Sequence, residues 1–121
     1  MRKSKYSNRI AYAGGRRFDS VKEMQRWAFL QGEEREGRIR DLRCQVRYEL
    51  TPVKACYVAD FVYLMPDGVE VIEDVKGMRT AVYRLKKAMM SALLGLEIRE
   101  VYAPGEPLGP ASVFPKKRKG R

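Results

Sequence analysis

The stretch ACYVADFVYLMPDGVEVIEDVKG, residues 55–77, predicts two strands joined by a tight turn. Residues 55–65 and 69–77 are rich in valine, tyrosine and other side chains that favour strands. Between them, a proline and an aspartate suit the two central positions of a type I turn, and a glycine suits the left-handed residue that follows. The sequence therefore predicts a β-hairpin with a three-residue loop at 66–68.

The length of this loop decides which side chains face each other. A three-residue loop places Asp60 opposite Asp74, and directly opposed residues point to the same face of a sheet. Lys76 shares that face because it lies two residues beyond Asp74, whereas Glu73 points to the other side and is interpreted as a bystander. A two-residue loop would instead place Asp60 opposite Val75 and separate the two aspartates.

The predicted cluster of Asp60, Asp74 and Lys76 suits chemistry on phosphate. Two neighbouring carboxylates can hold a hard divalent cation such as Mg²⁺, whose other ligands are water or substrate phosphate. A lysine beside them can orient or deprotonate a water molecule, or stabilise charge that develops on phosphorus. The alternative is an ion network that only stabilises the edge of the sheet.

The segments around the hairpin predict a small α/β domain. Helices are expected at about residues 20–36 and over 80–95, and further strands over 41–50 and 96–102. Because the last strand follows a helical crossover, we expect it to join the sheet in parallel. The predicted fold is a compact αβββαβ core with a mixed sheet flanked by helices.

The apolar periodicity also predicts which faces are buried. On the first helix, the predicted buried face consists of Met24, Trp27, Ala28 and Gln31. On the second helix, it consists of Val82, Leu85, Met89, Ala92 and Leu93. The strand before the hairpin alternates, which predicts one apolar side made of Leu42, Cys44, Val46, Tyr48 and Leu50.

Glu23 lies in the first turn of the predicted first helix, three residues after Ser20. This spacing is typical of a capping box, in which the two residues satisfy backbone amides at the start of the helix. The same turn borders the expected buried face, so Glu23 could also point toward the sheet. In that position it would add a third carboxylate to the cluster.

The positive charge of the chain is concentrated at its two ends. The 121 residues carry a net charge of +10, and residues 1–17 and 115–121 together hold eleven Lys and Arg and no acid. The remaining 14 Lys and Arg are balanced by 15 Asp and Glu, a net charge of about −1. Basic ends on a near-neutral domain suit a polyanion, although a solubilising or localising tail is the alternative for residues 115–121.

These patterns predict a basic arm at residues 1–17, one domain at 18–103, and a Pro/Gly linker with a basic tail at 104–121. Gly14 and Gly15 are expected to form a flexible joint in the arm. DNA contacts are expected from arm residues and from polar residues of the second helix, namely Lys3, Lys5, Arg16, Arg17, Tyr83, Lys86 and Lys87. A solvated lysine pair is the alternative for the last two.

Several functional classes are excluded by composition. The chain has no histidine, so no mechanism with a histidine base is possible. Cys44 and Cys56 are too few for a disulfide framework and are expected to be small buried residues. No apolar run approaches the roughly 20 residues that a membrane helix requires, and the N-terminus lacks the apolar segment of a secretory signal. We therefore expect a cytoplasmic protein, with no membrane partner.

The candidate residues resemble the pattern of the PD-(D/E)xK nuclease superfamily: an acid on a first helix, an aspartate on one strand, and Asp/Glu-x-Lys on the next. Here these are Glu23, Asp60 and DVK at 74–76. The blocks SKYSN, FDSVKEMQRW, GRIRDLRCQVRYEL, YVADFVY and EDVKGMRTAVYRLKK are similar to small phage-encoded endonucleases of this superfamily. The size and element order are similar to archaeal-type Holliday junction resolvases, and the resemblance spans about residues 4–101.

The resemblance implies a restriction-endonuclease-like fold and Mg²⁺-dependent phosphodiester hydrolysis, with Mn²⁺ able to substitute. It implies metal ligation by Asp60, Asp74 and the Val75 carbonyl, orientation of water by Lys76, and an assisting acid in Glu23. It also implies a homodimer that acts on a four-way DNA junction during recombination. If the protein is phage-encoded, its expected location is the cytoplasm of a bacterial host.

The resulting hypothesis is a metal-dependent, structure-selective DNA endonuclease of the Holliday junction resolvase type. A nicking or double-strand DNA endonuclease of the same superfamily is the nearest alternative. From a different class, the chain could be a non-catalytic, basic nucleic-acid-binding protein whose carboxylates are structural. That alternative gives no reason for Asp60 and Asp74 to share a face.

Overall fold

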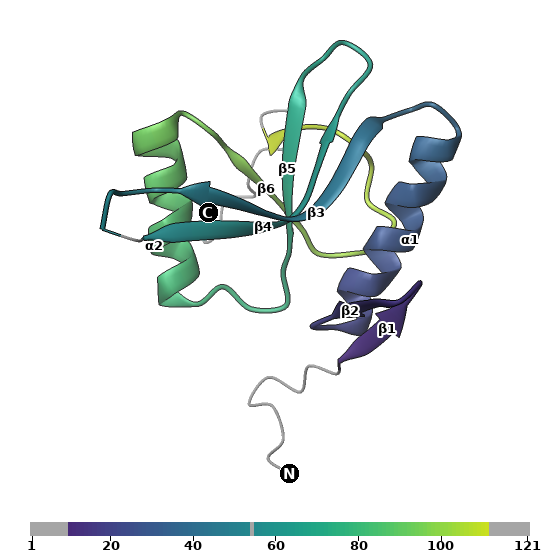
Figure 1. Cartoon of the computed structure of the whole chain (residues 1–121), viewed down its shortest axis with the longest axis horizontal. Helices are drawn as coiled ribbons and strands as arrows, with labels where there is room; N and C mark the ends of the chain where they lie inside the picture. Colours follow the sequence, from purple (N-terminus) through teal and green to yellow (C-terminus); the bar gives the residue numbers. More distant parts are fainter. Residues whose placement is uncertain (1–9, 54, 112–121) are drawn as a thin grey trace, which may run out of the picture.

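The hairpin that the sequence predicts is present with the expected register (Figure 1). In the computed structural model, which describes residues 10–53 and 55–111, strand β4 (Cys56–Leu64) runs antiparallel to β5 (Glu70–Val75). Val62 pairs with Ile72, which is the register of a three-residue loop. The loop glycine has a φ of 89°, in the left-handed region that only glycine adopts without strain. The two-residue loop is therefore excluded.

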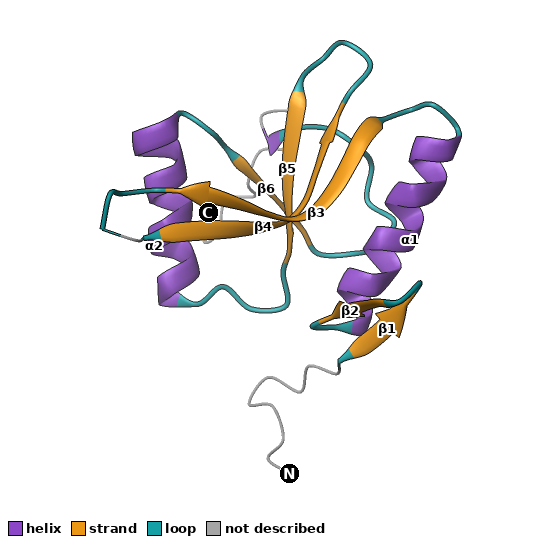
Figure 2. Ribbon diagram, in the orientation of Figure 1, coloured by secondary structure: helices purple, strands orange, loops and turns teal. Residues whose placement is uncertain are grey.

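The predicted order of elements is confirmed. The central part of the chain forms, in order, α1 (Val21–Arg35), β3 (Arg40–Glu49), β4, β5, α2 (Ala81–Met89), a π-helical turn η1 (Met90–Leu94) and β6 (Ile98–Val101). The four strands form a mixed sheet in the order β3-β4-β5-β6, and β6 is parallel to β5 as expected. Helices α1 and α2 lie on opposite sides of this sheet (Figure 2).

The single apolar side expected for β3 is divided between two cores. Leu42 and Cys44 pack in the cluster on the α1 side, whereas Val46 and Tyr48 pack in the cluster on the α2 side. The change occurs at Gln45, whose φ of 56° is unusual for a non-glycine residue inside a strand. The alternating pattern predicted the strand correctly, but it could not predict this twist in the middle of it.

The buried face of α1 is rotated from the predicted one. Ala28 is exposed, Met24 and Trp27 are only partly buried, and the most buried positions are Arg26 and Leu30 together with Glu23. The prediction was wrong because it assigned the buried face by hydrophobicity. A buried arginine finds a carboxylate partner across the domain, and no pattern within the helix can reveal that partner.

The predicted buried face of α2 is wrong at four of its five positions, and only Met89 packs against the core. Val82 and Leu85 are 62% and 61% exposed, and the helix instead packs on the sheet through Tyr83 and Met90. Tyr83 reaches a polar partner there because its hydroxyl donates a hydrogen bond to Glu100 of β6 at 2.9 Å. Periodicity thus located an apolar stripe correctly, but this stripe faces away from the core.

The N-terminal arm contains a hairpin where the sequence predicts a flexible joint. Strands β1 (Ala11–Ala13) and β2 (Arg16–Phe18) pair antiparallel, with Ala13 opposite Arg16. Gly14 and Gly15 connect them, and both have positive φ, as a two-residue type I′ turn requires. The glycines therefore define a tight turn. Lys3 and Lys5, by contrast, lie outside the described residues.

A buried ion pair connects α1 to the sheet. The side chains of Arg26 and Glu73 are both 0% exposed, and two nitrogen–oxygen contacts of 2.8 and 2.6 Å join them. Tyr63 also donates its hydroxyl to Glu73. Glu73 does point away from Asp74, as predicted, but it is a principal structural residue and no bystander.

The segment expected to be a linker after residue 103 is held against the domain. Arg26 also donates to the carbonyl oxygens of Pro104 and Glu106, at 2.9 and 2.6 Å. Arg99 of β6 pairs with the Glu106 side chain, and Leu108 packs in the α1-side cluster. Described residues of this segment therefore belong to the folded domain, although they form no strand and no long helix.

We expect Glu73→Gln to destabilise the protein by about 3–5 kcal/mol, because it leaves the buried Arg26 guanidinium without a counter-charge. Urea unfolding followed by circular dichroism measures this change. The matched control is Glu70→Gln, on the same strand and paired with Arg43 in an exposed contact, which should cost less than about 1 kcal/mol. Equal, small effects of both variants would contradict the structural role of the pair.

Candidate active site

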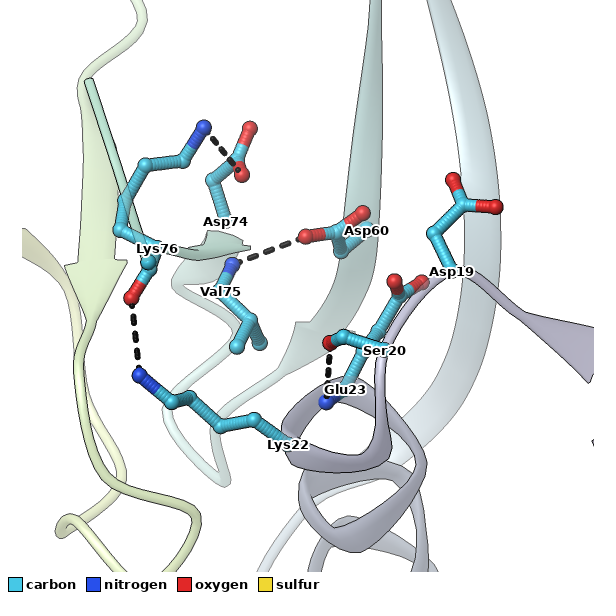
Figure 3. A pocket seen from close by; sticks show the side chains of 9 residues that line it. Asp19, Ser20, Lys22, Glu23, Asp60, Asp74, Val75 and Lys76 are labelled. Carbon is cyan, nitrogen blue, oxygen red and sulfur yellow. Dashed lines mark hydrogen bonds and ion pairs between the residues drawn. The ribbon is translucent and has the colours of Figure 1, made fainter. Parts of the chain in front are cut away.

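Four predicted site residues line one cavity of about 290 Å³ between the start of α1 and the end of β5 (Figure 3). Glu23 comes from α1, Asp60 from β4, Asp74 from β5, and Lys76 from the segment that follows β5. Val75 lines the same cavity. The structure therefore brings together the residues that the register predicted to share a face.

Asp60 lies where β4 and β5 begin to separate. The ladder between these strands ends at the pair of Phe61 and Glu73, and the Asp60 carboxylate then accepts a hydrogen bond from the Val75 amide at 2.8 Å. A side chain thus takes the place of the next backbone acceptor. This leaves the carboxylate at the cavity, anchored to the opposite strand (Figure 3).

Asp74 is buried, and each of its two carboxylate oxygens contacts a neighbouring side chain. Oδ1 lies 2.9 Å from the Lys76 ammonium, and Oδ2 accepts a hydrogen bond from the Tyr57 hydroxyl. Burial, and then the nearby Asp74 charge, raise the pKa of Tyr57 far above its ordinary value, so this hydroxyl remains a donor. The orientation of Asp74 is therefore fixed before any ligand binds.

Glu23 lines the cavity, and of the predicted capping box the structure shows the half that Ser20 contributes. Its backbone amide donates to the Ser20 hydroxyl at 3.0 Å, so Ser20 caps α1. Its side chain is buried and accepts a hydrogen bond from the Gln45 amide at 3.1 Å. In the pairing of β3 with β4, Gln45 lies opposite Asp60. Its hydrogen bond therefore holds the Glu23 carboxylate near Asp60.

Two carboxyl groups of the cavity, those of Asp60 and Glu23, have raised pKa values. Burial raises the pKa of Asp60 well above its ordinary value, and the charges of Asp74 and Glu23 raise it further. Burial also raises the pKa of Glu23, with added repulsion from Asp19 and Asp74. Ionised carboxylates at this cavity therefore repel one another and are poorly solvated, which is typical of a functional site.

A divalent cation fits this arrangement only with ligands from outside the chain. Within residues 10–53 and 55–111, no three acidic or cysteine side chains form a group that could hold a metal ion. Mg²⁺, however, is commonly held by one or two carboxylates, with water and phosphate oxygens completing its shell. Asp60 and Asp74 match that requirement, and a cation would relieve the repulsion that raises the pKa of Asp60.

The Lys76 ammonium packs over the ring of Tyr83, a residue that the sequence analysis predicted to contact DNA. The Lys76 ammonium lies 3.5 Å from the centre of the Tyr83 ring, and Tyr83 is 7% exposed. A cation over an aromatic face is attracted by the negative charge density of the ring. Tyr83 therefore helps to position the Lys76 ammonium. Because the Tyr83 side chain is buried, it is not available for the predicted direct contact with DNA.

The other predicted DNA contacts are dispersed. Arg16 lies over the Trp27 ring, with 5.0 Å between the guanidinium carbon and the ring centre, and Arg17 forms an exposed ion pair with Asp19 at 2.9 Å. On α2, Lys87 pairs with Glu100 at 3.0 Å. Lys86, which is partly exposed, forms no ion pair among the described residues.

Sequence reasoning missed several residues at the cavity. Asp19 and Lys22 line it, and the Lys22 ammonium donates to the Lys76 carbonyl at 3.2 Å. Lys22 is adjacent to Glu23 in the first helical turn, a signal that could have included it. Tyr57 and Gln45 gave no such signal, because their partners lie on other elements.

Residues 3–101 match a family described as "Protein of unknown function (DUF1064)". The chain belongs to this family. The match covers all the cavity-lining residues, from Asp19 to Gly77. Comparison with curated proteins gives no match, and comparison with solved structures gives none either.

The described helices also bear on the membrane prediction. Within residues 10–53 and 55–111, neither α1 nor α2 combines the length and the apolar character needed to cross a membrane.

We expect Asp60→Asn to stabilise the protein at pH 7 by about 0.5–2 kcal/mol, the usual gain when an unfavourable group at a functional site is replaced. Because the folded state holds the Asp60 proton more tightly than the unfolded state, wild-type stability falls as pH rises through the folded pKa. The gain should therefore shrink toward pH 4. Urea unfolding at several pH values measures it.

The control for this experiment is Asp41→Asn, an exposed residue whose positive φ asparagine tolerates. It should change stability by less than about 0.5 kcal/mol at every pH. A loss of stability in Asp60→Asn at pH 7 would contradict carboxylate repulsion at this site.

Proposed function

We propose that this protein is a divalent-metal-dependent endonuclease that hydrolyses phosphodiester bonds in DNA. The observation that carries the proposal is the convergence of Glu23, Asp60, Asp74 and Lys76 in one cavity. Burial raises the pKa of Asp60, and the neighbouring charges of Asp74 and Glu23 raise it further, which supports a functional role for this group of carboxylates. The basic character of the chain supports a polyanionic substrate.

Each residue has a distinct role in this proposal. Asp60 and Asp74 hold the cation. The carbonyl of Val75, which directly follows Asp74 and lines the same cavity, is a further candidate ligand. Lys76 orients the attacking water and offsets negative charge near the phosphorus, while Tyr83 keeps its ammonium in position. The bound cation would supply Lewis-acid stabilisation of the phosphate and a lower pKa for water.

Glu23 assists from the α1 side of the cavity. Burial raises the pKa of Glu23, so its carboxylate is a stronger base than that of an exposed glutamate. Its hydrogen bond from Gln45 fixes the carboxylate, so it can accept a proton from water that approaches Asp60. Lys22 adds a second ammonium at the cavity and favours an anionic substrate there.

Among DNA substrates, a four-way junction is the one that the sequence resemblance favours. The resemblance to resolvases is supported by the αβββαβ order and by the placement of Asp60 and Asp74 on adjacent strands. Cutting a junction symmetrically needs two active sites. The proposed enzyme therefore acts as a homodimer.

The test uses a labelled four-way junction and a matched linear duplex, each with and without Mg²⁺. We expect cleavage of the junction in Mg²⁺ or Mn²⁺, none without metal, and a loss of at least about 100-fold in Asp74→Asn, because one metal-binding carboxylate is removed. Glu70→Gln, an exposed acid on the same strand, should cut like wild type. Unchanged cutting by Asp74→Asn would refute the site, and equal cutting of linear duplex would refute the junction preference.

Metal binding has a separate readout. Mg²⁺ or Mn²⁺ should raise the unfolding temperature of the wild type, because a ligand that binds only the folded state stabilises it. The increase should be smaller in Asp60→Asn and in Asp74→Asn. An identical increase in all three proteins would place the cation elsewhere.

We infer that the homodimer forms through the exposed stripe of α2 and η1, which consists of Val82, Leu85, Leu93 and Leu94. Scattered exposed apolar residues are ordinary, but a helical stripe of this kind marks an interaction surface. Exposed Arg84 and Glu97 lie at opposite ends of this stripe. In an antiparallel two-fold pairing, Arg84 of each copy approaches the end of the other copy that carries Glu97.

We expect Leu85→Glu to shift the protein from dimer to monomer, because a charge at the centre of the stripe would be buried in the interface. Sedimentation velocity measures the change. Val53→Glu, at an exposed loop position away from α2, should leave the dimer intact. A wild-type monomer at all concentrations used in the cleavage assay would contradict the dimer.

A further inference from the structure

The β1–β2 hairpin is a rigid part of the domain. Phe18 is buried in the α1-side cluster, and Arg16 lies over the Trp27 ring of α1 at 5.0 Å. These two side chains hold the hairpin from one face. Figure 1 shows the hairpin beside α1. The opposite face of the hairpin is consequently presented to solvent in a fixed orientation.

That outer face combines an aromatic ring with a cation. Tyr12 and Arg17 are cross-strand partners in the hairpin, so their side chains lie side by side on the same face. Tyr12 is 70% exposed, and the Arg17 side chain is 55% exposed. Nucleic-acid-binding surfaces use this pairing of groups, with the cation on phosphate and the ring on sugar or base.

The hairpin leads directly into the candidate active site. β2 ends at Phe18, and the next two residues, Asp19 and Ser20, line the cavity. A DNA strand with a phosphate at the cavity can therefore also reach the hairpin, which ends one residue before the cavity lining begins. The ion pair between Arg17 and Asp19 is exposed and worth little, so a DNA phosphate can replace Asp19 as the partner of Arg17.

We propose that the β1–β2 hairpin is a DNA-binding ribbon that enters the major groove of the duplex beside the scissile phosphate, with Arg17 on the backbone and Tyr12 on the groove surface. The major groove admits a two-stranded ribbon, and this one ends in two glycines that keep its tip narrow. The inference rests on the proposed function for the position of the scissile phosphate. To that function the inference adds the β1–β2 hairpin as the element that binds the duplex beside the scissile phosphate.

The test measures binding to a short duplex by fluorescence anisotropy without divalent metal, over a series of salt concentrations. Arg17→Gln should weaken binding several-fold and reduce the slope of log K against log salt by about one, because one phosphate contact is lost. Tyr12→Ala should weaken binding several-fold, because it removes apolar contact with base edges such as the thymine methyl group, and should leave the slope unchanged. Tyr12→Phe should retain most of the affinity, because it keeps the ring.

The chain provides a matched control for Arg17. Arg47 forms the same kind of contact with Glu49, two residues away at 2.9 Å, and its side chain is 58% exposed on β3. Arg47→Gln removes the same charge and should leave the salt slope unchanged. Equal slopes in Arg17→Gln and Arg47→Gln would overturn the proposal.

Two further outcomes separate this inference from the proposed function. Equal loss of affinity for a single strand and for the duplex in Tyr12→Ala would overturn the groove placement. A wild-type protein that binds duplex through Tyr12 and Arg17 but cuts no DNA in Mg²⁺ would refute the endonuclease and leave the ribbon standing.

Discussion

The buried pair of Arg26 and Glu73 is the interaction on which the arrangement of this domain depends. Moving two charges out of water costs several kcal/mol for each ion, and the cost is offset only when the geometry is good and the remaining donors are satisfied. Here the guanidinium binds the carboxylate with two nitrogens and also reaches the carbonyls of Pro104 and Glu106. Helix α1, strand β5 and the C-terminal loop must therefore assemble together.

The same pair positions the candidate active site. Arg26 follows Glu23 by one turn of α1, so both side chains leave the same face of the helix. Glu73 directly precedes Asp74, and neighbouring residues of a strand point to opposite faces. Fixing Arg26 against Glu73 on one side of the sheet therefore places Glu23 within reach of the cavity that Asp74 lines.

Helix α2 connects the candidate site to a second surface. Its inward Tyr83 carries the Lys76 ammonium on its ring, while its outward face exposes the apolar stripe that contains Leu85. If two copies pair through that stripe, as proposed, each lysine is supported by a helix that is itself held at the interface. The N-terminal hairpin lies beside α1 (Figure 1). The proposed duplex contact therefore lies beside α1, whereas the proposed dimer contact lies on α2 and η1.

The sequence by itself determined the order of elements, the three-residue loop and the register that brings Asp60 and Asp74 together. These depend on local signals: turn residues, strand periodicity and the fixed alternation of side chains in a hairpin. Tertiary structure alone decided that Glu73 is a buried anchor, that Gln45 holds Glu23, and that the apolar face of α2 is exposed. The physical reason is that burial of a charge, or exposure of an apolar stripe, depends on a partner from a distant part of the chain or from another molecule, and no local pattern specifies that partner.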